Sequence, residues 1–236
     1  MATPGEGTQA EKEKLLGGSL IFKALDEVAR RELASYAQMR QIRAGTPIFH
    51  AGDPGSSLMA IATGTVRISM LTPTSREVVL AELGAGDVFG EVALLDGGER
   101  SADATAITNC SLAVLERRSV VRLLESQPRL AIRLIELLCA RLRRSDARML
   151  ELSFLDLPSR LARTLIRATT PQDGGARPLG KLALSQTVLA NMVGSSRENV
   201  NRCLRGWQKG GVIDLRDGWV VILDRAALEG LGTMQE

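Results

Sequence analysis

The sequence has 236 residues, of which 44% are hydrophobic and 24% charged, and it carries a formal net charge of +3. This composition is that of a folded protein with one large domain or two modest ones, and it excludes a wholly disordered chain. One histidine and three scattered cysteines leave little material for a histidine-built metal site or a histidine-assisted nucleophile, so we expect no metal and no catalytic residues. Such cysteines suit a reducing cytoplasm, and we expect neither a signal peptide nor a membrane span.

The charge is divided unevenly along the chain. Residues 157–236 carry eleven lysines and arginines against seven aspartates and glutamates, whereas residues 1–156 carry a slight acidic excess. The pattern predicts that only the C-terminal part meets a polyanion. Aromatic residues make up only 3% of the chain, which argues against a protein that binds single strands by stacking their bases.

The N-terminal half predicts helices followed by many short strands. Residues 1–14 are rich in Gly, Thr, Glu and Lys, and we expect a flexible tail there. Apolar residues at helical spacing within 21–40 predict one or two short helices. From about residue 41 to 115, short apolar runs lie between glycines and partly alternate with polar residues, which is typical of an antiparallel sandwich or barrel.

A long helix is predicted after the strands. Residues 117–126 indicate a short helix, and Pro128 suits the first turn of another. Residues 129–155 contain no Gly or Pro, so one helix on the order of 40 Å can run through them. Its apolar residues recur every three or four positions, which fits either packing on its own domain or pairing with its twin in a homodimer. The length favours the homodimer, and the break at 156–158 predicts a domain boundary.

The segment 89–102 has the chemistry of a phosphate cradle. Gly90 lets the backbone approach a ligand closely, and exposed N–H groups in a short turn can bind phosphate oxygens. Arg100 can add a forked, charge-assisted contact, and Ser101 a hydroxyl donor. Glu91 accepts hydrogen bonds only, which suits a ribose hydroxyl. The set matches a cyclic nucleotide monophosphate, whereas a Glu and an Arg alone would indicate only a surface ion pair on a turn.

Residues 184–205 indicate a helix, a tight turn and a second helix. Ser185 can cap the first helix, and Gly194 supplies the turn. The second helix is predicted to begin near Ser195 or Ser196. This is the spacing of a helix-turn-helix, whose second helix enters the major groove of DNA.

The opening turns of the second helix carry side chains that can read bases. Arg197 and Arg202 can each bind guanine O6 and N7 together, and Glu198 can accept from cytosine N4. Asn201 and Arg205 are further candidate contacts to the groove or to phosphate. Two other interpretations stay open: Ser195 and Glu198 also have the spacing of a capping box, and arginines often form a solvated face.

The string GEVALLDGGERSADATA closely resembles the phosphate-binding cassette of the bacterial catabolite activator and fumarate/nitrate-reduction regulator superfamily. The resemblance covers about residues 20–225. It implies an α+β fold with an N-terminal antiparallel β-roll over 15–127, a long dimerisation helix and hinge over 128–156, and a winged helix-turn-helix over 157–236. By this resemblance the cassette residues that bind a cyclic nucleotide are Gly90, Glu91, Val92, Ala93, Arg100 and Ser101.

The motif Ser-Arg-Glu-x-Val-x-Arg at 196–202 resembles the recognition helix of the catabolite activator branch, which reads a TGTGA-like half-site. Two half-sites in an inverted repeat require a two-fold dimer. Alternating residues around Asp217-Gly218 predict a hairpin, the wing, near phosphate. The resemblance also implies contact with RNA polymerase, which some relatives touch at the place of residues 171–177. The implied DNA-binding residues are Ser185, Gln186, Ser196, Arg197, Glu198, Asn201 and Arg202.

The resemblance also indicates where the base of the nucleotide lies. Counting back from Phe154-Leu155-Asp156, which matches the family's hinge, places the base-contacting pair on Ser145 and Asp146. This departs from the Thr-Ser pair of the cyclic AMP receptors. An ionised Asp146 can accept from adenine's amino group or from guanine's N1–H and N2–H, or it can pair with a neighbouring arginine on the surface. Family frequency favours cAMP, and cGMP stays open.

Two other functions compete with a cyclic-nucleotide-responsive regulator. A regulator of the same fold could be independent of a ligand or could sense a cyclic dinucleotide, although an intact Glu91, Arg100 and Ser101 set speaks against both. An enzyme such as a cyclic phosphodiesterase would need metal ligands or a base near phosphate. The one histidine, His50, is remote in sequence from the cradle and is expected at a strand end on the surface.

Overall fold

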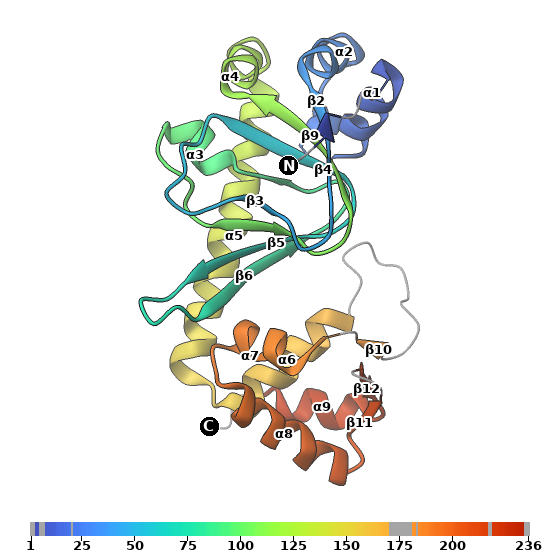
Figure 1. The fold of residues 1–236 in the computed structure, drawn as a ribbon, viewed down its shortest axis with the longest axis vertical. Helices are drawn as coiled ribbons and strands as arrows, with labels where there is room; N and C mark the ends of the chain where they lie inside the picture. Colours follow the sequence, from blue (N-terminus) through green and yellow to red (C-terminus); the bar gives the residue numbers. More distant parts are fainter. Residues whose placement is uncertain are drawn as a thin grey trace. The chain divides into compact units, whose positions relative to one another are not determined.

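The computed structural model describes residues 3–4, 8–19, 21–169, 181–182, 184–216 and 219–233 (Figure 1). The chain divides into two compact units, which are Met1–Leu71 with Val79–Leu142, and Thr72–Val78 with Arg143–Glu236. Two predicted features, the loop 171–177 and the turn at Asp217-Gly218, lie outside the described residues. In the part of the chain that the structure describes, no helix is long and apolar enough to cross a membrane.

The first unit contains two antiparallel sheets, as expected for a β-roll. One has the strand order β1-β2-β9-β4-β7 and the other the order β3-β8-β5-β6. Residues of both sheets share one core, which includes Met59 and Ile61 of one sheet and Val66 of the other. The strands are β1 (Thr3–Pro4), β2 (Gln38–Ile42), β3 (Pro47–Phe49), β4 (Ser57–Thr63), β5 (Val66–Leu71), β6 (Glu77–Leu83), β7 (Val88–Phe89), β8 (Asp103–Ala106) and β9 (Cys110–Glu116).

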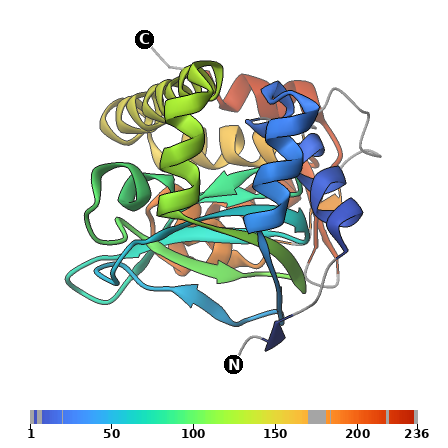
Figure 2. The ribbon, with the colours of Figure 1, turned by 90° about the horizontal axis from the view of Figure 1, so that it is seen from above.

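Strands β4 and β9 of the five-stranded sheet are buried on both faces. Alternate residues of β4, such as Leu58 and Ala60, belong to a second core shared with the helices, where α2 and α4 lie side by side (Figure 2). Burial on two faces explains why β4 and β9 are almost wholly apolar rather than strictly alternating. The helices of this part of the chain are α1 (Gln9–Gly18), the 3₁₀ turn η1 (Phe22–Ala24), α2 (Glu27–Tyr36), α3 (Glu91–Asp96), α4 (Arg117–Ser126) and α5 (Pro128–Phe154).

The flexible tail predicted for residues 1–14 is wrong from Gln9 onward, because α1 begins there. The backbone N–H of Glu11 donates to the Thr8 hydroxyl at 3.3 Å, and the Glu11 carboxylate accepts from the Thr8 N–H at 2.8 Å. This capping box satisfies two backbone donors that the first turn would otherwise leave exposed. Leu16 is completely buried and anchors α1 in the helix-side core. The composition of residues 1–14 does not indicate a helix, but the Thr8-x-x-Glu11 spacing does, because it is the spacing of a capping box.

The single long helix predicted after Pro128 is confirmed as α5. Its first turns are anchored, because Leu130 and Leu134 are buried in the helix-side core. Beyond them Ile135, Leu142 and Met149, each seven residues from the next, are 59%, 63% and 67% exposed. A helix with apolar residues exposed at this period has one stripe that the described residues do not cover.

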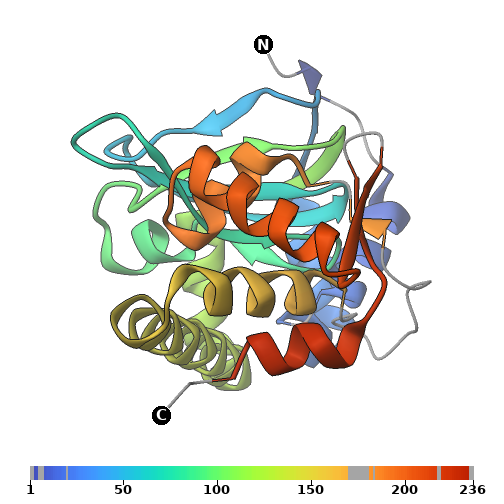
Figure 3. The ribbon, with the colours of Figure 1, turned by 90° about the horizontal axis from the view of Figure 1, so that it is seen from below.

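The second unit is a small helical domain with a three-stranded sheet. Its core joins α6, α7 and α8, including Leu161, Leu189, Val200 and Leu204, and α6 lies beside α9 (Figure 3). The strands are antiparallel in the order β10-β12-β11. The elements are α6 (Leu157–Thr169), β10 (Lys181–Leu182), α7 (Gln186–Val193), α8 (Arg197–Lys209), β11 (Ile213–Arg216), β12 (Trp219–Ile222) and α9 (Arg225–Leu231).

Candidate functional site

The phosphate cradle predicted at 89–102 begins with a glycine that no other residue can replace without strain. Gly90 precedes α3 with a left-handed φ of 79°. A Cβ at this position would lie 2.5 Å from Nη1 of Arg100 and 3.1 Å from the carbonyl oxygen of Ser57. Only a residue without Cβ adopts this conformation at low cost and leaves room for the guanidinium. The absence of a side chain at Gly90 therefore lets the guanidinium of Arg100 approach the backbone.

Arg100 is 5% exposed and is held in one orientation. Its Nη1 donates to the carbonyl oxygens of Ser57 at 2.8 Å and Gly90 at 2.9 Å, and its Nη2 donates to the Ser57 hydroxyl at 2.9 Å. The guanidinium carbon also lies 4.3 Å from the centre of the Phe49 ring, a cation–π contact. Desolvation by burial lowers the pKa of Arg100, and the charges of Asp53 and Glu91 partly offset that effect.

The buried Nε of Arg100 has no hydrogen-bond partner among the described residues. A guanidinium has five N–H donors, and three are engaged here. The Nε–H and one hydrogen of Nη2 are left, on a group that burial has already stripped of water. A buried unsatisfied donor costs about 1–3 kcal/mol, more when charged, so the arrangement favours an anion that accepts from it.

Glu91, the first residue of α3, is 1% exposed and is paired with a residue that the sequence analysis did not single out. Nη1 of Arg141 donates to Oε1 of Glu91, and Nη2 of Arg141 donates to the carbonyl oxygen of Val88. Arg141 lies on α5, so the cradle joins the long helix through this ion pair. The pair leaves Oε2 of Glu91 as an acceptor for a ligand hydroxyl.

The remaining predicted ligand residues differ in exposure. Ala93 is buried. It packs so closely on Gly55 that a Cβ added to Gly55 would lie 2.1 Å from the Cβ of Ala93. Val92 is 38% exposed and Ser101 is also exposed, unlike the buried Arg100.

Ser145 and Asp146 lie on α5, where both are exposed. Ser145 follows Arg141 by four residues and therefore projects from the same side of the helix. In the described chain no ion pair joins Asp146 to Arg143 or Arg144, two of the arginines with which it could have paired on the surface.

Three side chains of the cradle were missed by sequence reasoning: Ser57, Phe49 and Arg141. Ser57 and Phe49 come from strands far from the cassette in sequence, and only the pairing of the strands brings them to Arg100. Arg141 could have been predicted as part of the site, because it lies one helical turn before Ser145, the predicted base contact. In the sequence it is one of many arginines on the long helix.

The helix-turn-helix is built by two serine caps and a glycine. The hydroxyl of Ser185 accepts from the Val188 N–H at 3.2 Å and caps the start of α7, and Gly194, with a φ of 66°, caps its end. The hydroxyl of Ser196 accepts from the Asn199 N–H at 3.2 Å and begins α8. The cap of α8 is therefore Ser196, and the capping box considered for Ser195 and Glu198 is not formed.

The predicted reading side chains lie on the outer side of α8. Arg197, Glu198 and Arg202 are exposed, whereas Val200 and Leu204 are completely buried on the opposite side. Hydrogen bonds from the backbone N–H of Glu198 and from Ser196 lower the pKa of the Glu198 carboxyl, so it is ionised and can only accept. Gln186, at the start of α7, donates to Oδ1 of Asn201 at 3.2 Å and ties the two helices together.

Comparison with known protein families agrees with both halves of this description. Residues 39–127 match the cyclic nucleotide-binding domain, and residues 159–231 match the Crp-like helix-turn-helix domain. The two domains together define a DNA-binding transcription regulator with a cyclic nucleotide-binding domain, and not an enzyme.

Proteins similar to this chain over most of its length show which family it belongs to. The chain is 37% identical over 212 residues to the cyclic AMP receptor protein of Thermus thermophilus, covering 90% of this chain and 96% of the relative. It is 32% identical over 219 residues to the CRP-like cAMP-activated global transcriptional regulator of Mycobacterium tuberculosis, covering 92% and 97%. The structure of the c-di-GMP responsive global regulator CLP of Xanthomonas campestris matches with a TM-score of 0.75 at 28% identity, covering 84% and 99%. The chain belongs to the CRP/FNR family of transcription regulators.

Proposed function

We propose that the protein is a homodimeric transcription regulator that binds a 3′,5′-cyclic nucleotide, cAMP in preference to cGMP, and then binds a TGTGA-like inverted repeat in DNA. The observation that carries the ligand assignment is the buried Nε–H of Arg100, which has no acceptor among the described residues. A cyclic phosphate supplies an anionic acceptor for that donor. We place this activity in the cytoplasm, which the unpaired cysteines suit.

The ligand is held by its phosphate and its ribose. Arg100 donates from Nε and Nη2 to the equatorial oxygens of the phosphate, and the exposed Ser101 adds its hydroxyl. The backbone of Val92 and Ala93 lies at the start of α3, behind Gly90, and contributes N–H donors. The ribose 2′-hydroxyl donates to Oε2 of Glu91, since Arg141 occupies Oε1. Arg141 is thus a positioning residue that fixes the acceptor for the ribose.

The base of the ligand lies toward Ser145 and Asp146. Their position on α5, one turn beyond Arg141, supports this placement because Arg141 already reaches the ribose acceptor. The relatives from Thermus thermophilus and Mycobacterium tuberculosis are named for cAMP, which supports adenine as the base. With adenine bound, the carboxylate of Asp146 accepts from the amino group.

The dimer forms along α5. Exposed Ile135, Leu142 and Met149 repeat every seven residues, which is the spacing of one seam of a two-stranded coiled coil. Leu138 and Leu152 fall at the second apolar position of the same heptads. Ser145 shares that position, so the base of the nucleotide meets the seam and bound ligand acts on the pairing of the two helices.

The two helix-turn-helix domains of the dimer read the two half-sites. In each, Arg197, Glu198 and Arg202 contact base edges, and the serines at 185 and 196, with Gln186 and Asn201, contribute polar contacts around them. The bound protein contacts RNA polymerase. Residues 154–158 act as the hinge, and the ligand favours the orientation of the DNA-binding domains that fits consecutive major grooves, because it binds that state more tightly.

Calorimetric titration with cAMP and with cGMP tests the ligand. We expect one cAMP per chain for the wild-type protein and weaker binding of cGMP. Arg100→Gln removes a charge-assisted contact worth about 1.5–3 kcal/mol, so cAMP should bind roughly 10- to 100-fold more weakly. The matched control is Arg118→Gln, which removes an arginine of the same unit whose side chain is 83% exposed. Binding of neither nucleotide, or equal affinity of the two variants, contradicts the assignment.

A second candidate ligand is a cyclic dinucleotide. The structural neighbour from Xanthomonas campestris is described as c-di-GMP responsive, at 28% identity over nearly its whole length. The same titration with c-di-GMP separates the two ligands. Tight binding of c-di-GMP that survives Glu91→Gln would favour this candidate, because the 2′-hydroxyl contact would then be unnecessary. If no nucleotide binds and DNA binding is nevertheless tight, the regulator is ligand-independent.

A further inference from the structure

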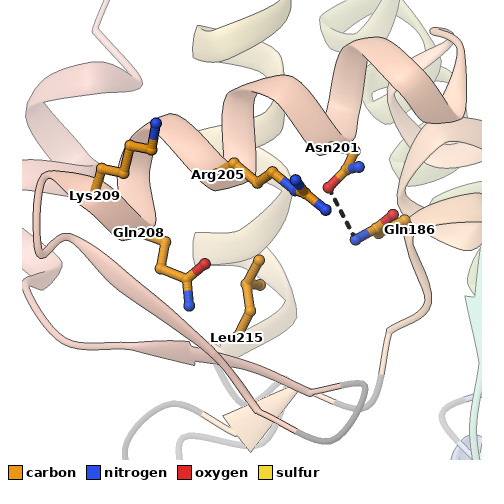
Figure 4. Close-up of a pocket in the computed structure, with 6 residues that line it drawn as sticks. All are labelled: Gln186, Asn201, Arg205, Gln208, Lys209 and Leu215. Atoms are coloured by element: carbon orange, nitrogen blue, oxygen red, sulfur yellow. Dashed lines mark hydrogen bonds between the residues drawn. The ribbon is translucent and has the colours of Figure 1, made fainter.

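We propose that Arg205 and Lys209 form a phosphate clamp, in which they hold a backbone phosphate of duplex DNA in the groove between α8 and the wing. The proposal rests on the proposed DNA-binding function and adds a contact outside the base-reading turn of α8. A groove of about 400 Å³ lies here within the second unit (Figure 4). The residues lining it are Gln186, Asn201, Arg205, Gln208, Lys209 and Leu215.

The groove is positively charged, which favours binding of an anion. Its lining contains two cations and three amides but no carboxylate. The one acid of the facing strand β11, Asp214, is engaged by Nε of Arg216 and by Nε2 of Gln208. Within residues 184–216 and 219–233, no ion pair is formed by Arg205 or Lys209. The two cations are therefore uncompensated by the described residues of this domain.

The walls of the groove are held in place by hydrogen bonds. Gln186 donates to Asn201 at 3.2 Å across one end, and Gln208 donates to Asp214 at 3.2 Å across the other (Figure 4 shows the first of these bonds). These bonds fix α7 and β11 relative to α8, so the concave surface exists before a ligand arrives. A preformed surface lowers the ordering cost of binding.

The spacing along α8 connects the groove to the reading residues. Arg197, Asn201, Arg205 and Lys209 follow one another at intervals of four and form a continuous stripe on the helix. With a rise of about 1.5 Å per residue, Arg205 and Lys209 lie roughly 12 and 18 Å beyond Arg197.

These separations favour the phosphate backbone over base edges. The major groove is about 12 Å wide, so a helix whose first turn contacts bases carries its last turns to the wall of the groove. The wall is a row of phosphates. Lysine is a flexible point charge and arginine a planar fork, and both bind phosphate without reading sequence.

The salt dependence of DNA binding tests the clamp. Fluorescence anisotropy measures the affinity of the cAMP-treated protein for a labelled inverted-repeat duplex and for a scrambled duplex over a range of salt concentrations. We expect Arg205→Gln and Lys209→Gln each to weaken binding to both duplexes by the same factor. Each should reduce the slope of log K against log salt by about 0.9 per chain, or about 1.8 per dimer. Arg225→Gln, which removes a half-exposed arginine of α9 outside the groove, is the matched control and should leave the slope unchanged.

A neutral methylphosphonate placed singly at each phosphate beside the half-site locates the contact. At one such position the wild-type protein should lose affinity while the R205Q/K209Q protein loses none. An unchanged salt slope in R205Q/K209Q, or a loss confined to the inverted repeat, overturns the clamp while leaving DNA binding intact. If the wild-type protein binds both duplexes equally well, the proposed target sequence fails, and the salt slopes of the variants still decide the clamp. If it binds no duplex at all, both proposals fall.

Discussion

Replacing Gly90 with alanine isolates the contribution of Arg100 to ligand binding. The substitution has two effects, a strained left-handed backbone at φ 79° and a Cβ placed 2.5 Å from Nη1 of Arg100. The strain costs about 1–2 kcal/mol. Gly45 has the same φ of 79°, and a Cβ added there would meet nothing within 4 Å, so Gly45→Ala carries the strain without the collision.

Comparing the two variants separates the effect of the backbone strain from the effect of the collision with Arg100. Gly45→Ala should lower the free energy of unfolding by about 1–2 kcal/mol, measured by denaturant titration. Gly90→Ala should lower it further, because the collision also disturbs the hydrogen bonds of the buried Arg100. Only Gly90→Ala should displace the guanidinium from its carbonyl acceptors and so misdirect its Nε toward the phosphate. We expect the loss of a charge-assisted contact, roughly 10- to 100-fold in the dissociation constant for cAMP, measured by calorimetry. Equal cAMP affinity of the two variants would refute the role assigned to Arg100.

Four further substitutions test other parts of the account. Arg141→Gln leaves the buried carboxylate of Glu91 without its cation, so the thermal midpoint should fall, and it should recover in the E91Q/R141Q double variant without recovery of cAMP binding. Leu142→Glu places a charge on the predicted seam, and sedimentation should then show monomers, whereas we expect dimers of the wild-type protein. Glu198→Ala should relax discrimination at one base pair of the half-site in competition binding, with unchanged affinity for scrambled DNA. Thr8→Ala removes the cap of α1 and should lower the free energy of unfolding by about 1 kcal/mol, and no change would count against that cap.

The local sequence was sufficient to predict the helix-turn-helix and the long helix. Ser185, Gly194 and the buried Val200 and Leu204 give caps, turn and core spacing that are all encoded within a few residues. Only the cap of α8 was left open between two residues, because Ser195 and Ser196 are equally suitable by type. The error at residues 9–14 arose from weighing composition above the capping-box spacing.

The cradle could be predicted only in part, because its geometry depends on contacts between distant segments. Gly90, Glu91 and Arg100 stand together in one motif. Ser57, which orients Arg100, reaches it through the fold of the β-roll from 43 residues away. Arg141, which pairs with Glu91, is 50 residues away on α5. A helical arginine has many possible partners, and only the packing of the first turns of α5 within the first unit selects this one.

The proposed regulator works only if ligand binding is coupled to DNA binding. The most direct test is the anisotropy of a labelled TGTGA inverted-repeat duplex titrated with wild-type protein and with Arg100→Gln. Each is measured without cAMP and with cAMP at a concentration that fills the wild-type site and leaves most of the weakened site of the variant empty. We expect cAMP to tighten DNA binding of the wild-type protein by tenfold or more, about 1.4 kcal/mol of coupling, and to change that of the variant far less. Equal affinity of the wild-type protein with and without cAMP, at concentrations where calorimetry shows the site filled, would contradict it.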